Sequence, residues 1–325
     1  MRSVQVTRFG GPEVMVASES PDPAPGPGQT VVSVSAVHVL FVETQIRRGW
    51  GQEYFRVQPP YVPGDAVAGQ VILVGEGVDH GWIGRRVAAR TREGGGYADR
   101  ALVSVEELIP VPDGLDLRKA AALLHDGPTA LALFDNARIE PQEQVLVLGA
   151  AGGLGLLLVQ LAHAASAQVI GAARGRRKLD VVQEAGADVA VDYAEPGWAE
   201  QVRKVIGDAG FDVVFDGVGG TVGAAAFGLT APGGRFSAHG APSGGFADID
   251  AQAAQALGVT VRGIEQVQFA PAESKRLAER ALSEAAAGRL RPVIGQTFPL
   301  ERAAEAHAAM EARVVLGTTL LLPNG

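Results

Sequence analysis

Residues 145–155 read Val-Leu-Val-Leu-Gly-Ala-Ala-Gly-Gly-Leu-Gly, a short apolar run that leads into a glycine-rich turn. Leucine and alanine then repeat on one helical face over 154–165, so the stretch predicts a buried strand, a tight turn and an amphipathic helix. In the dinucleotide-binding fingerprint, the central glycine lets a pyrophosphate approach the backbone and the last glycine lets the helix pack on the strand. Gly152 and Gly155 hold those places, while Ala150 replaces the first glycine. Because the N–H groups of a helix start also attract phosphate, we expect a dinucleotide here.

The segment after residue 144 alternates apolar strands with helices at the spacing of a parallel sheet. The predicted strands are 145–148, 168–172, 189–192, 213–216, 234–238 and 259–263. This series predicts an α/β fold with a doubly wound parallel sheet. Further helices are expected at 271–287 and 303–313, followed by a closing strand at 314–322.

The first third of the chain has a different sequence pattern, in which short runs of β-branched residues alternate with proline- and glycine-rich turns. Its candidate strands are 3–7, 30–37, 66–74, 86–89 and 101–105. This pattern predicts a compact all-β lobe. An alanine- and leucine-rich helix follows at 120–134, and Gly127 and Pro128 are expected to break it.

The end of the second strand of the parallel sheet decides which dinucleotide fits, because a carboxylate there would hold the ribose of NAD. Residues 174–178 instead read Arg-Gly-Arg-Arg-Lys, beginning 19 residues after Gly155, with no acid among them. Guanidinium groups bind phosphate in a fork and an ammonium adds a point charge. The cluster therefore favours the 2′-phosphate of NADPH, and a solvated basic helix start is the alternative interpretation.

Composition excludes several classes of chemistry. The 325 residues include no cysteine, which rules out a thiol nucleophile, a disulfide framework, an iron–sulfur cluster and cysteine-bound zinc. The formal net charge of −8, from 28 Lys plus Arg and 36 Asp plus Glu, argues against nucleic acid or an anionic membrane as a partner. Residues 1–12 lack the features of a secretory signal, so we expect a cytoplasmic protein. The six histidines, at positions 38, 80, 125, 163, 239 and 307, show no metal-ligand spacing.

Over essentially its whole length the chain resembles the medium-chain dehydrogenase/reductase superfamily, in particular its zinc-independent quinone oxidoreductase branch. The matching pieces are weak singly but specific in this order and spacing. They are Phe9–Val14 (FGGPEV), Pro63–Gly69 (PGDAVAG), Val74–Val78 (VGEGV), Gly95–Asp99 (GGYAD), Ala120–Leu124 (AAALL) with Thr129-Ala130, Ala151–Gly155 (AGGLG), Gly186–Asp188 (GAD) and Asp212–Asp216 (DVVFD). The resemblance implies a GroES-like β lobe at 1–121, a Rossmann NADPH-binding domain at 122–267, a return to the first lobe at 268–325, and an active site in the cleft between the domains.

The resemblance also implies roles for individual residues of this chain. The pyrophosphate would contact Gly152, Gly153 and Leu154; the 2′-phosphate would lie among Arg174, Lys178 and Tyr193; Thr129 would face the nicotinamide; and Val218, His239 and Gly240 would line the cofactor track. An edge strand at Val259–Gly263 would pair with its mate in a homodimer.

The zinc-dependent branch of the superfamily needs a cysteine near residue 38, a histidine near residue 61 and a further cysteine beyond residue 120. This chain has His38, Tyr61 and no cysteine, so we expect no zinc. Without a metal, the acceptor itself must carry the negative charge that hydride addition creates. We therefore expect NADPH-dependent, metal-free reduction of a quinone or an α,β-unsaturated carbonyl compound.

The substrate side of the expected site departs from the family pattern. Leu40 falls where the family has an asparagine that faces the nicotinamide and the substrate, and Glu43 replaces the usual aspartate. Trp50 and Tyr54 would form an aromatic wall for a flat substrate, or else pack the lobe. The candidate proton donors are Tyr54 and His125, for which a hydrogen-bonded structural role is the alternative.

Two other functions compete with this expectation. The first is an enoyl-thioester reductase of fatty-acid or polyketide type, in which Arg47, Arg48 and Arg56 would attract a long carrier arm. The second is a non-catalytic NADPH-binding protein, an alternative that the apolar Leu40 keeps open.

Overall fold

The computed structural model describes residues 1–53 and 55–323. The chain divides into two compact units. The terminal unit comprises 1–127 and 278–325, and the central unit comprises 128–277. The chain passes between them inside two helices, α2 (Leu117–Ala137) and α8 (Pro271–Ala286). The three-part division expected from the sequence, with boundaries after residues 121 and 267, stays a prediction.

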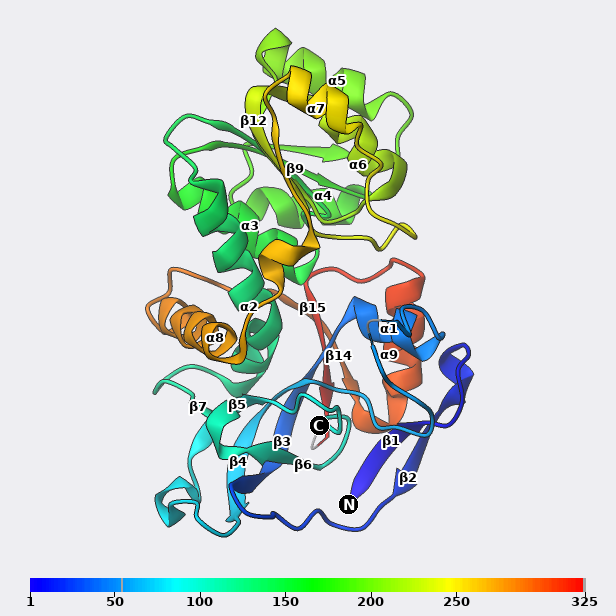
Figure 1. Ribbon diagram of the computed structural model, residues 1–325, viewed down its shortest axis with the longest axis vertical. Coiled ribbons are helices and arrows are strands. Elements are labelled where there is room, and N and C mark those ends of the chain that lie inside the picture. Colours follow the sequence, from blue (N-terminus) through cyan, green and yellow to red (C-terminus); the bar gives the residue numbers. More distant parts are fainter. Residues whose placement is uncertain (54, 324–325) are drawn as a thin grey trace. The chain divides into compact units, whose positions relative to one another are not determined.

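The central unit is built on a parallel sheet of six strands in the order β10-β9-β8-β11-β12-β13. The strands are β8 (Gln144–Leu148), β9 (Gln168–Ala173), β10 (Val189–Asp192), β11 (Phe211–Asp216), β12 (Thr230–Ala238) and β13 (Thr260–Arg262). The chain runs outward from β8 to β10, returns to β11 beside β8, and then runs outward in the other direction. Right-handed crossovers then place the helices of the two halves on opposite faces of the sheet. The doubly wound sheet predicted from the sequence is confirmed (Figure 1).

The strands of this sheet are apolar on both sides because helices cover both faces. Val145, Leu146 and Val147 on β8 are fully buried, as are Phe211 and Phe215 on β11. The covering helices are α3 (Gly153–Ala164), α4 (Arg176–Glu184), α5 (Trp198–Ile206), α6 (Gly220–Phe227) and α7 (Ala251–Ala256). Packing against these helices fixes the central strands. Because the strands are parallel, their carboxyl ends lie at the same edge of the sheet.

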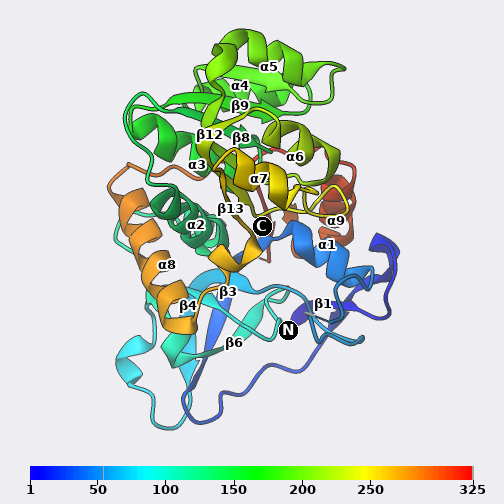
Figure 2. The same ribbon diagram turned by 45° about the horizontal axis from the view of Figure 1, so that its top comes forward.

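The terminal unit contains a seven-stranded sheet in the order β14-β15-β3-β4-β5-β7, with β6 also paired to β3, and a separate β1-β2 pair. Figure 1 labels these strands, and Figure 2 shows β1, β3, β4 and β6 from a second direction. Its strands are β1 (Arg2–Val6), β2 (Met15–Glu19), β3 (Gln29–Val39), β4 (Ala66–Val74), β5 (Arg86–Arg90), β6 (Arg100–Ser104), β7 (Ile109–Pro110), β14 (Ile294–Pro299) and β15 (Thr318–Leu322). Helices α1 (Phe41–Arg47) and α9 (Ala303–Glu311) pack against each other. The residues that follow β3, from Leu40 onward, are the start of the expected substrate region.

Some expected elements differ from the observed ones. The expected break at Pro128 is wrong, because α2 continues through it. A proline removes one backbone hydrogen bond of a helix, but Leu123, Leu131 and Leu133 are fully buried on either side of it, and their packing holds the helix together. Strands β2 and β14 were not predicted from the sequence, because few of their residues are buried.

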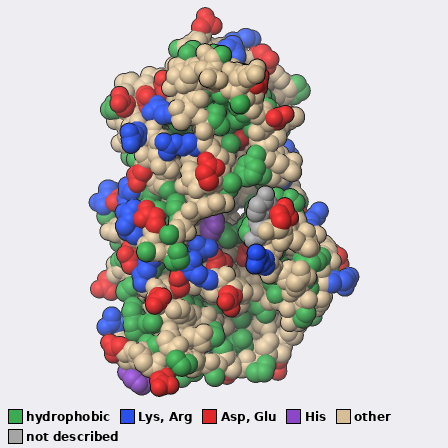
Figure 3. Space-filling model, viewed as in Figure 1, with side chains coloured by type: hydrophobic (Ala, Val, Ile, Leu, Met, Phe, Trp, Pro, Cys, Tyr) green, Lys and Arg blue, Asp and Glu red, His purple; other side chains and the backbone are tan. Residues whose placement is uncertain are grey.

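The surface mixes charges of both signs. On the face shown in Figure 3, lysine and arginine side chains are interspersed with aspartate and glutamate side chains. Among the described residues, no helix combines the length and the apolar character that crossing a membrane requires.

Candidate cofactor and substrate sites

The turn after β8 has the geometry of a phosphate cradle. Gly152 is extended and immediately precedes α3, so the N–H groups of the first helical turn point out of the helix end. A Cβ atom at Gly152 would have the carbonyl oxygen of Gly149, at 3.4 Å, as its nearest neighbour. A Cβ at Gly155 would lie 2.7 Å from the Cα of Ala150, closer than real Cβ atoms approach backbone. Gly152 therefore leaves room beside the backbone, whereas Gly155 permits the close approach of helix and strand.

Residues at the carboxyl ends of β11 and β12 meet this turn. Asp216 at the end of β11 is in register with Leu148 at the end of β8. A Cβ at Gly149 would lie 3.4 Å from Cγ2 of Val218. The backbone N–H groups of His239 and Gly240 both donate to the carbonyl of Asp216 at 3.1 Å. The three residues expected along the cofactor track therefore lie together at the point where the strand order reverses, which is where such sheets bind ligands.

The side chain of Asp216 holds this edge together, a role that the sequence interpretation missed. It is fully buried, and its Oδ1 accepts hydrogen bonds from the backbone of Val218 at 2.9 Å and of Gly219 at 2.8 Å. Its Oδ2 has no hydrogen-bond partner among the described residues, and burial raises the pKa of this carboxyl. The sequence feature that could have indicated this role is the aspartate at the end of the DVVFD segment. Asp216 shapes the turn that presents Val218.

His239 is a neutral polar group at the same edge. It is buried, and its Nδ1 lies 3.1 Å from the hydroxyl of Ser237, which accepts a hydrogen bond from Gln266 at 2.9 Å. Burial lowers the pKa of His239 to about 4. The ring is therefore uncharged at neutral pH and can offer a hydrogen bond without adding positive charge.

The basic cluster begins directly after β9. The guanidinium of Arg174 lies 5.9 Å from the ring centroid of Tyr193, which follows β10, and Arg174 is exposed. Lys178 is in the first turn of α4, where its N–H donates to the carbonyl of Gly175. The Asp192 carboxylate accepts the N–H of Gly175 at 2.8 Å and so stabilises the loop between Arg174 and the helix. The structure thus brings Arg174 and Tyr193 together at the end of the second strand.

On the terminal unit, Leu40 is fixed by a buried acid. Leu40 is 8% exposed and lies between β3 and α1. Glu43 accepts three hydrogen bonds of 2.9 Å, from the backbone of Leu40, from the backbone of Gly64 and from the hydroxyl of Tyr97. Burial raises the pKa of Glu43 to about 7. Glu43 therefore ties the start of α1 to the loop that contains Gly64.

Behind Glu43 lies a buried polar network that the sequence interpretation missed, because its members are far apart in the chain. The hydroxyl of Tyr97 is 3.0 Å from Nε2 of His307, and both side chains are fully buried. Arg47 is also fully buried and pairs with Glu311, which binds Arg48 as well. The expectation that Arg47 offers its charge to a carrier arm is therefore wrong.

Of the segment expected to form the aromatic wall, the structure describes Trp50 and the neighbouring Phe55. The rings of Trp50 and Phe55 have centroids 6.3 Å apart, and Trp50 is 42% exposed. Tyr54, expected as a pocket residue and proton donor, lies outside the described residues. The other candidate donor, His125, lies on α2 one turn before Thr129.

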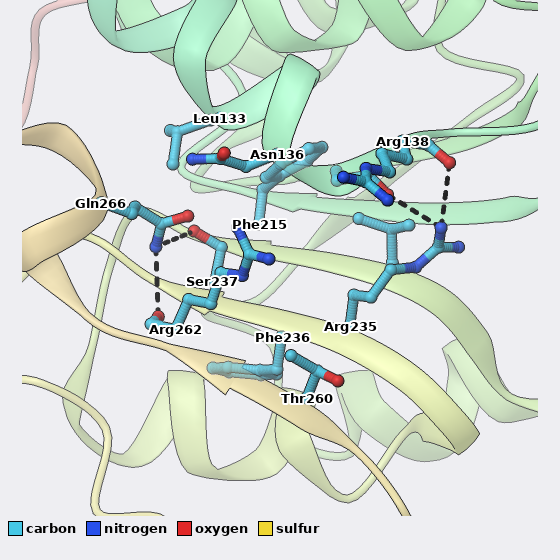
Figure 4. Close-up of a pocket in the computed structure, with 12 residues that line it drawn as sticks. Leu133, Asn136, Arg138, Phe215, Arg235, Phe236, Ser237, Thr260, Arg262 and Gln266 are labelled. Carbon is cyan, nitrogen blue, oxygen red and sulfur yellow. Dashed lines mark hydrogen bonds between the residues drawn. The ribbon is translucent and has the colours of Figure 1, made fainter.

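The central unit contains a cavity of about 250 Å³, which Ser237 and Gln266 beside His239 help to line (Figure 4). It is lined by residues of α2, β11, β12 and β13 and their neighbours, namely Leu133, Asn136, Ala137, Arg138, Val213, Phe215, Arg235, Phe236, Ser237, Thr260, Arg262 and Gln266. Arg235 is held in place there by the carbonyl groups of Ala137 and Arg138. None of the residues expected to bind cofactor or substrate lines this cavity. We therefore base the candidate site on the strand ends.

Residues 1–53 and 55–323 contain no group of three or more histidine, aspartate or glutamate side chains that could hold a metal ion. Metal-free chemistry stays a prediction, made from the missing cysteines.

Comparison with protein families gives two matches. Residues 26–113 match the model of an alcohol dehydrogenase GroES-like domain, and residues 153–283 match the model of a zinc-binding dehydrogenase. The expected combination of a GroES-like lobe with a Rossmann-type sheet is thereby confirmed. The second model is named for zinc, although this chain has no cysteine.

Individual relatives cover nearly the whole chain. A quinone oxidoreductase of Sus scrofa is 33% identical, over 99% of this chain and 98% of its own length. A 2-haloacrylate reductase of a Burkholderia species is 32% identical, over 98% of each chain. Among solved structures, the Escherichia coli quinone oxidoreductase in complex with NADPH has a TM-score of 0.90 and 27% identity, over 99% of this chain and 100% of that one.

Proposed function

Since the chain belongs to the quinone oxidoreductase family of the medium-chain dehydrogenases and reductases, we propose that it is an NADPH-dependent reductase of quinones or α,β-unsaturated carbonyl compounds. The observation that carries this proposal is the convergence of Gly152, Val218 and His239 at the edge where the strand order reverses. The quinone oxidoreductase names and the complexes with NADPH among the relatives support it.

The residues at this edge fit a dinucleotide. Gly152, Gly153 and Leu154 would hold the pyrophosphate at the start of α3, where a Cβ at residue 152 would fill the cradle. Arg174, Lys178 and Tyr193 would surround the 2′-phosphate that distinguishes NADPH from NADH. Thr129, Val218, His239 and Gly240 would line the path toward the nicotinamide.

The nicotinamide, when bound, supplies a hydride. The protein's own residues bind and orient the reactants and control the charge around them. His239 is neutral, so it can donate a hydrogen bond to an amide while leaving the local charge unchanged. Leu40, 8% exposed, contributes an apolar side chain on a backbone that Glu43 fixes, which suits a flat conjugated substrate. A conjugated acceptor can spread the new negative charge over several atoms, so no metal is required.

The enoyl-thioester alternative loses part of its support, because Arg47 is buried against Glu311. Arg56 is exposed and Arg48 shares Glu311 with Arg47. The non-catalytic alternative predicts NADPH binding without turnover.

NADPH oxidation at 340 nm, measured over a panel of quinones, enones, enoyl thioesters and saturated ketones, tests the proposal. We expect turnover with the first two groups and none with saturated ketones. Tight NADPH binding with no turnover of any substrate contradicts it and favours a binding protein. Preferential turnover of enoyl thioesters supports the alternative enzyme.

A further inference from the structure

Two histidines and an aspartate cluster on the terminal unit, between β3 and α2. Nε2 of His38 lies 3.8 Å from Oδ2 of Asp126, and Nδ1 of His125 lies 3.8 Å from Oδ1 of the same carboxylate. The two imidazole rings are perpendicular, with centroids 6.4 Å apart. One carboxylate therefore lies between two imidazoles, with one oxygen toward each.

The buried member of this cluster faces the carboxylate. His38 is 4% exposed, and the charged groups that act on it are Asp126 and His125. Burial lowers the pKa of His38 to about 4, so its ring is neutral at pH 7. Its Nδ1 is buried with no hydrogen-bond partner among the described residues, whereas Nε2 faces the carboxylate. The ring proton is therefore best placed on Nε2, toward Asp126.

His125 is the accessible member. Its side chain is 36% exposed, and its Nδ1 faces Asp126, which leaves Nε2 on the far side of the ring. His125 and Thr129 are four residues apart on α2 and so lie on one helical face. His38 lies near the end of β3, two residues before Leu40, which follows the strand and immediately precedes α1. His125 is thus one helical turn before Thr129 on the same helix, and Thr129 is the position expected at the nicotinamide.

We propose that His125 is the proton donor of the reaction, that Asp126 and His38 are positioning residues for it, and that the substrate is therefore an enone or enal rather than a quinone. This inference rests on the proposed function. A hydride adds to the carbon β to the carbonyl and the C=C π electrons move to form an enolate. The α carbon then forms a C–H bond as the Nε2–H bond of the His125 imidazolium breaks. The neutral imidazole regains a proton from water.

The choice of substrate follows from where the proton must go. A reduced quinone holds its new charge on oxygens, which water protonates without help. An enolate must be protonated at carbon, which is slower and gains from a positioned acid by about 100-fold or more. A histidine that lies beside a carboxylate and a second histidine is useful for the second reaction and adds little to the first.

The kinetic test compares His125→Gln and Asp126→Asn with the exposed control His80→Gln, on a matched enone and quinone. We expect His125→Gln to lower kcat on the enone about 100-fold or more and kcat on the quinone less than 10-fold. Asp126→Asn should lower enone kcat about 10-fold and leave the NADPH affinity, measured by fluorescence, unchanged. His80→Gln should match the wild type. Equal losses on enone and quinone contradict the assignment.

A second measurement needs no substrate and no cofactor. In the ¹⁵N-histidine NMR spectrum of the wild-type protein, His38 should show a neutral ring with the proton on Nε2. Asp126→Asn should shift this signal toward a mixture of tautomers, and an unchanged His38 signal contradicts the pairing. Turnover of quinones but not enones by the wild type refutes this inference and leaves the proposed function intact. No turnover of either refutes both.

Discussion

Arg174 is one exposed guanidinium, and we expect it to determine which dinucleotide the proposed site accepts. It lies beside Tyr193 at the end of β9, where an acid would favour NADH. A charge-assisted hydrogen bond contributes about 1.5–3 kcal/mol, so Arg174→Ala should raise the Kd of NADPH about 10- to 100-fold and leave that of NADH unchanged.

The binding measurement for this prediction is quenching of intrinsic fluorescence by each nucleotide. Lys204→Ala on α5 is the matched control, because it removes one exposed positive charge elsewhere on the same unit. Equal affinity of the wild-type protein for NADH and NADPH contradicts the role given to Arg174.

Buried histidines should make the protein sensitive to acid. Burial lowers the pKa of His38 and His239 to about 4 and that of His307 to about 3, whereas an unfolded histidine titrates near 6.5. Their contribution to stability is therefore complete above about pH 6.5 and is lost as the pH falls toward 4. Glu43 acts in the opposite direction, because its pKa is raised to about 7 and its contribution is lost as the pH rises from about 4.5 through 7.

With three histidines against two carboxyls, Glu43 and Asp216, whose pKa values burial raises, the free energy of unfolding should fall by about 1–2 kcal/mol for each unit by which the pH is lowered near pH 5.5. Replacing His307 by glutamine keeps a hydrogen-bonding group beside Tyr97 and removes one titrating ring. His307→Gln should therefore reduce this slope by roughly 1 kcal/mol per pH unit. Urea unfolding at several pH values measures the slope. His80→Gln should leave it unchanged, and a wild-type slope in His307→Gln would refute the assignment.

At the scale of elements, two glycines in the turn between β8 and α3, Gly152 and Gly155, have different roles. Gly152→Ala should fold normally, because a Cβ there has only a 3.4 Å contact, but it should weaken NADPH binding at least 10-fold by filling the phosphate cradle. Gly155→Ala should lower the free energy of unfolding by about 2 kcal/mol or more, because its Cβ meets backbone that cannot yield.

Thermal unfolding and NADPH titration on both glycine variants check this pair of predictions. The account is wrong if Gly152→Ala binds NADPH like the wild type, or if Gly155→Ala is as stable as the wild type. Each variant serves as the control for the other, since both add one methyl group to the same turn.

Local patterns were sufficient for much of the fold. The strand, turn and helix at 145–165 depend on neighbouring residues, and β4 (66–74) and β10 (189–192) were predicted to the residue. The path of α2 through Pro128 was not predictable in this way, because the packing that outweighs the proline comes from elsewhere in the chain. Strand β2 was missed because four of its residues are exposed, so its sequence lacks the alternation of apolar and polar residues that indicates a half-buried strand.

At the scale of the whole molecule, those parts of the candidate site were predictable whose functional residues are neighbours in the sequence. The glycine turn and the basic cluster are contiguous in the sequence. The contacts of Glu43 with Tyr97 and of His38 with Asp126 join residues 54 and 88 positions apart, so only the folded chain reveals them. Asp216 was visible as an acid at a strand end, but its two backbone partners were not.

The edge of the central sheet leads to a prediction about assembly. Strand β13 is the last strand of that sheet, and Val261 on it is 38% exposed. We expect two copies to pair through this edge, giving a particle of twice 33.6 kDa in sedimentation. A lysine on an edge strand opposes such pairing, so Val261→Lys should give monomers.

Val205→Lys is the control for the assembly experiment, because Val205 is 56% exposed on α5, away from the sheet edge. It should remain a dimer. A wild-type protein that sediments as a monomer, or a dimeric Val261→Lys variant, contradicts this mode of pairing.

The central claim is that the protein transfers a hydride from NADPH to the β carbon of a conjugated carbonyl compound. The most direct test is mass spectrometry of the product formed from an enone and NADPH that carries deuterium at both hydrogen positions of C4 of the nicotinamide. The account predicts one deuterium at the β carbon of the product and, when the reaction is run in D₂O with unlabelled NADPH, one at the α carbon. An unlabelled product, an alcohol labelled at the carbonyl carbon, or bound NADPH with no product contradicts it.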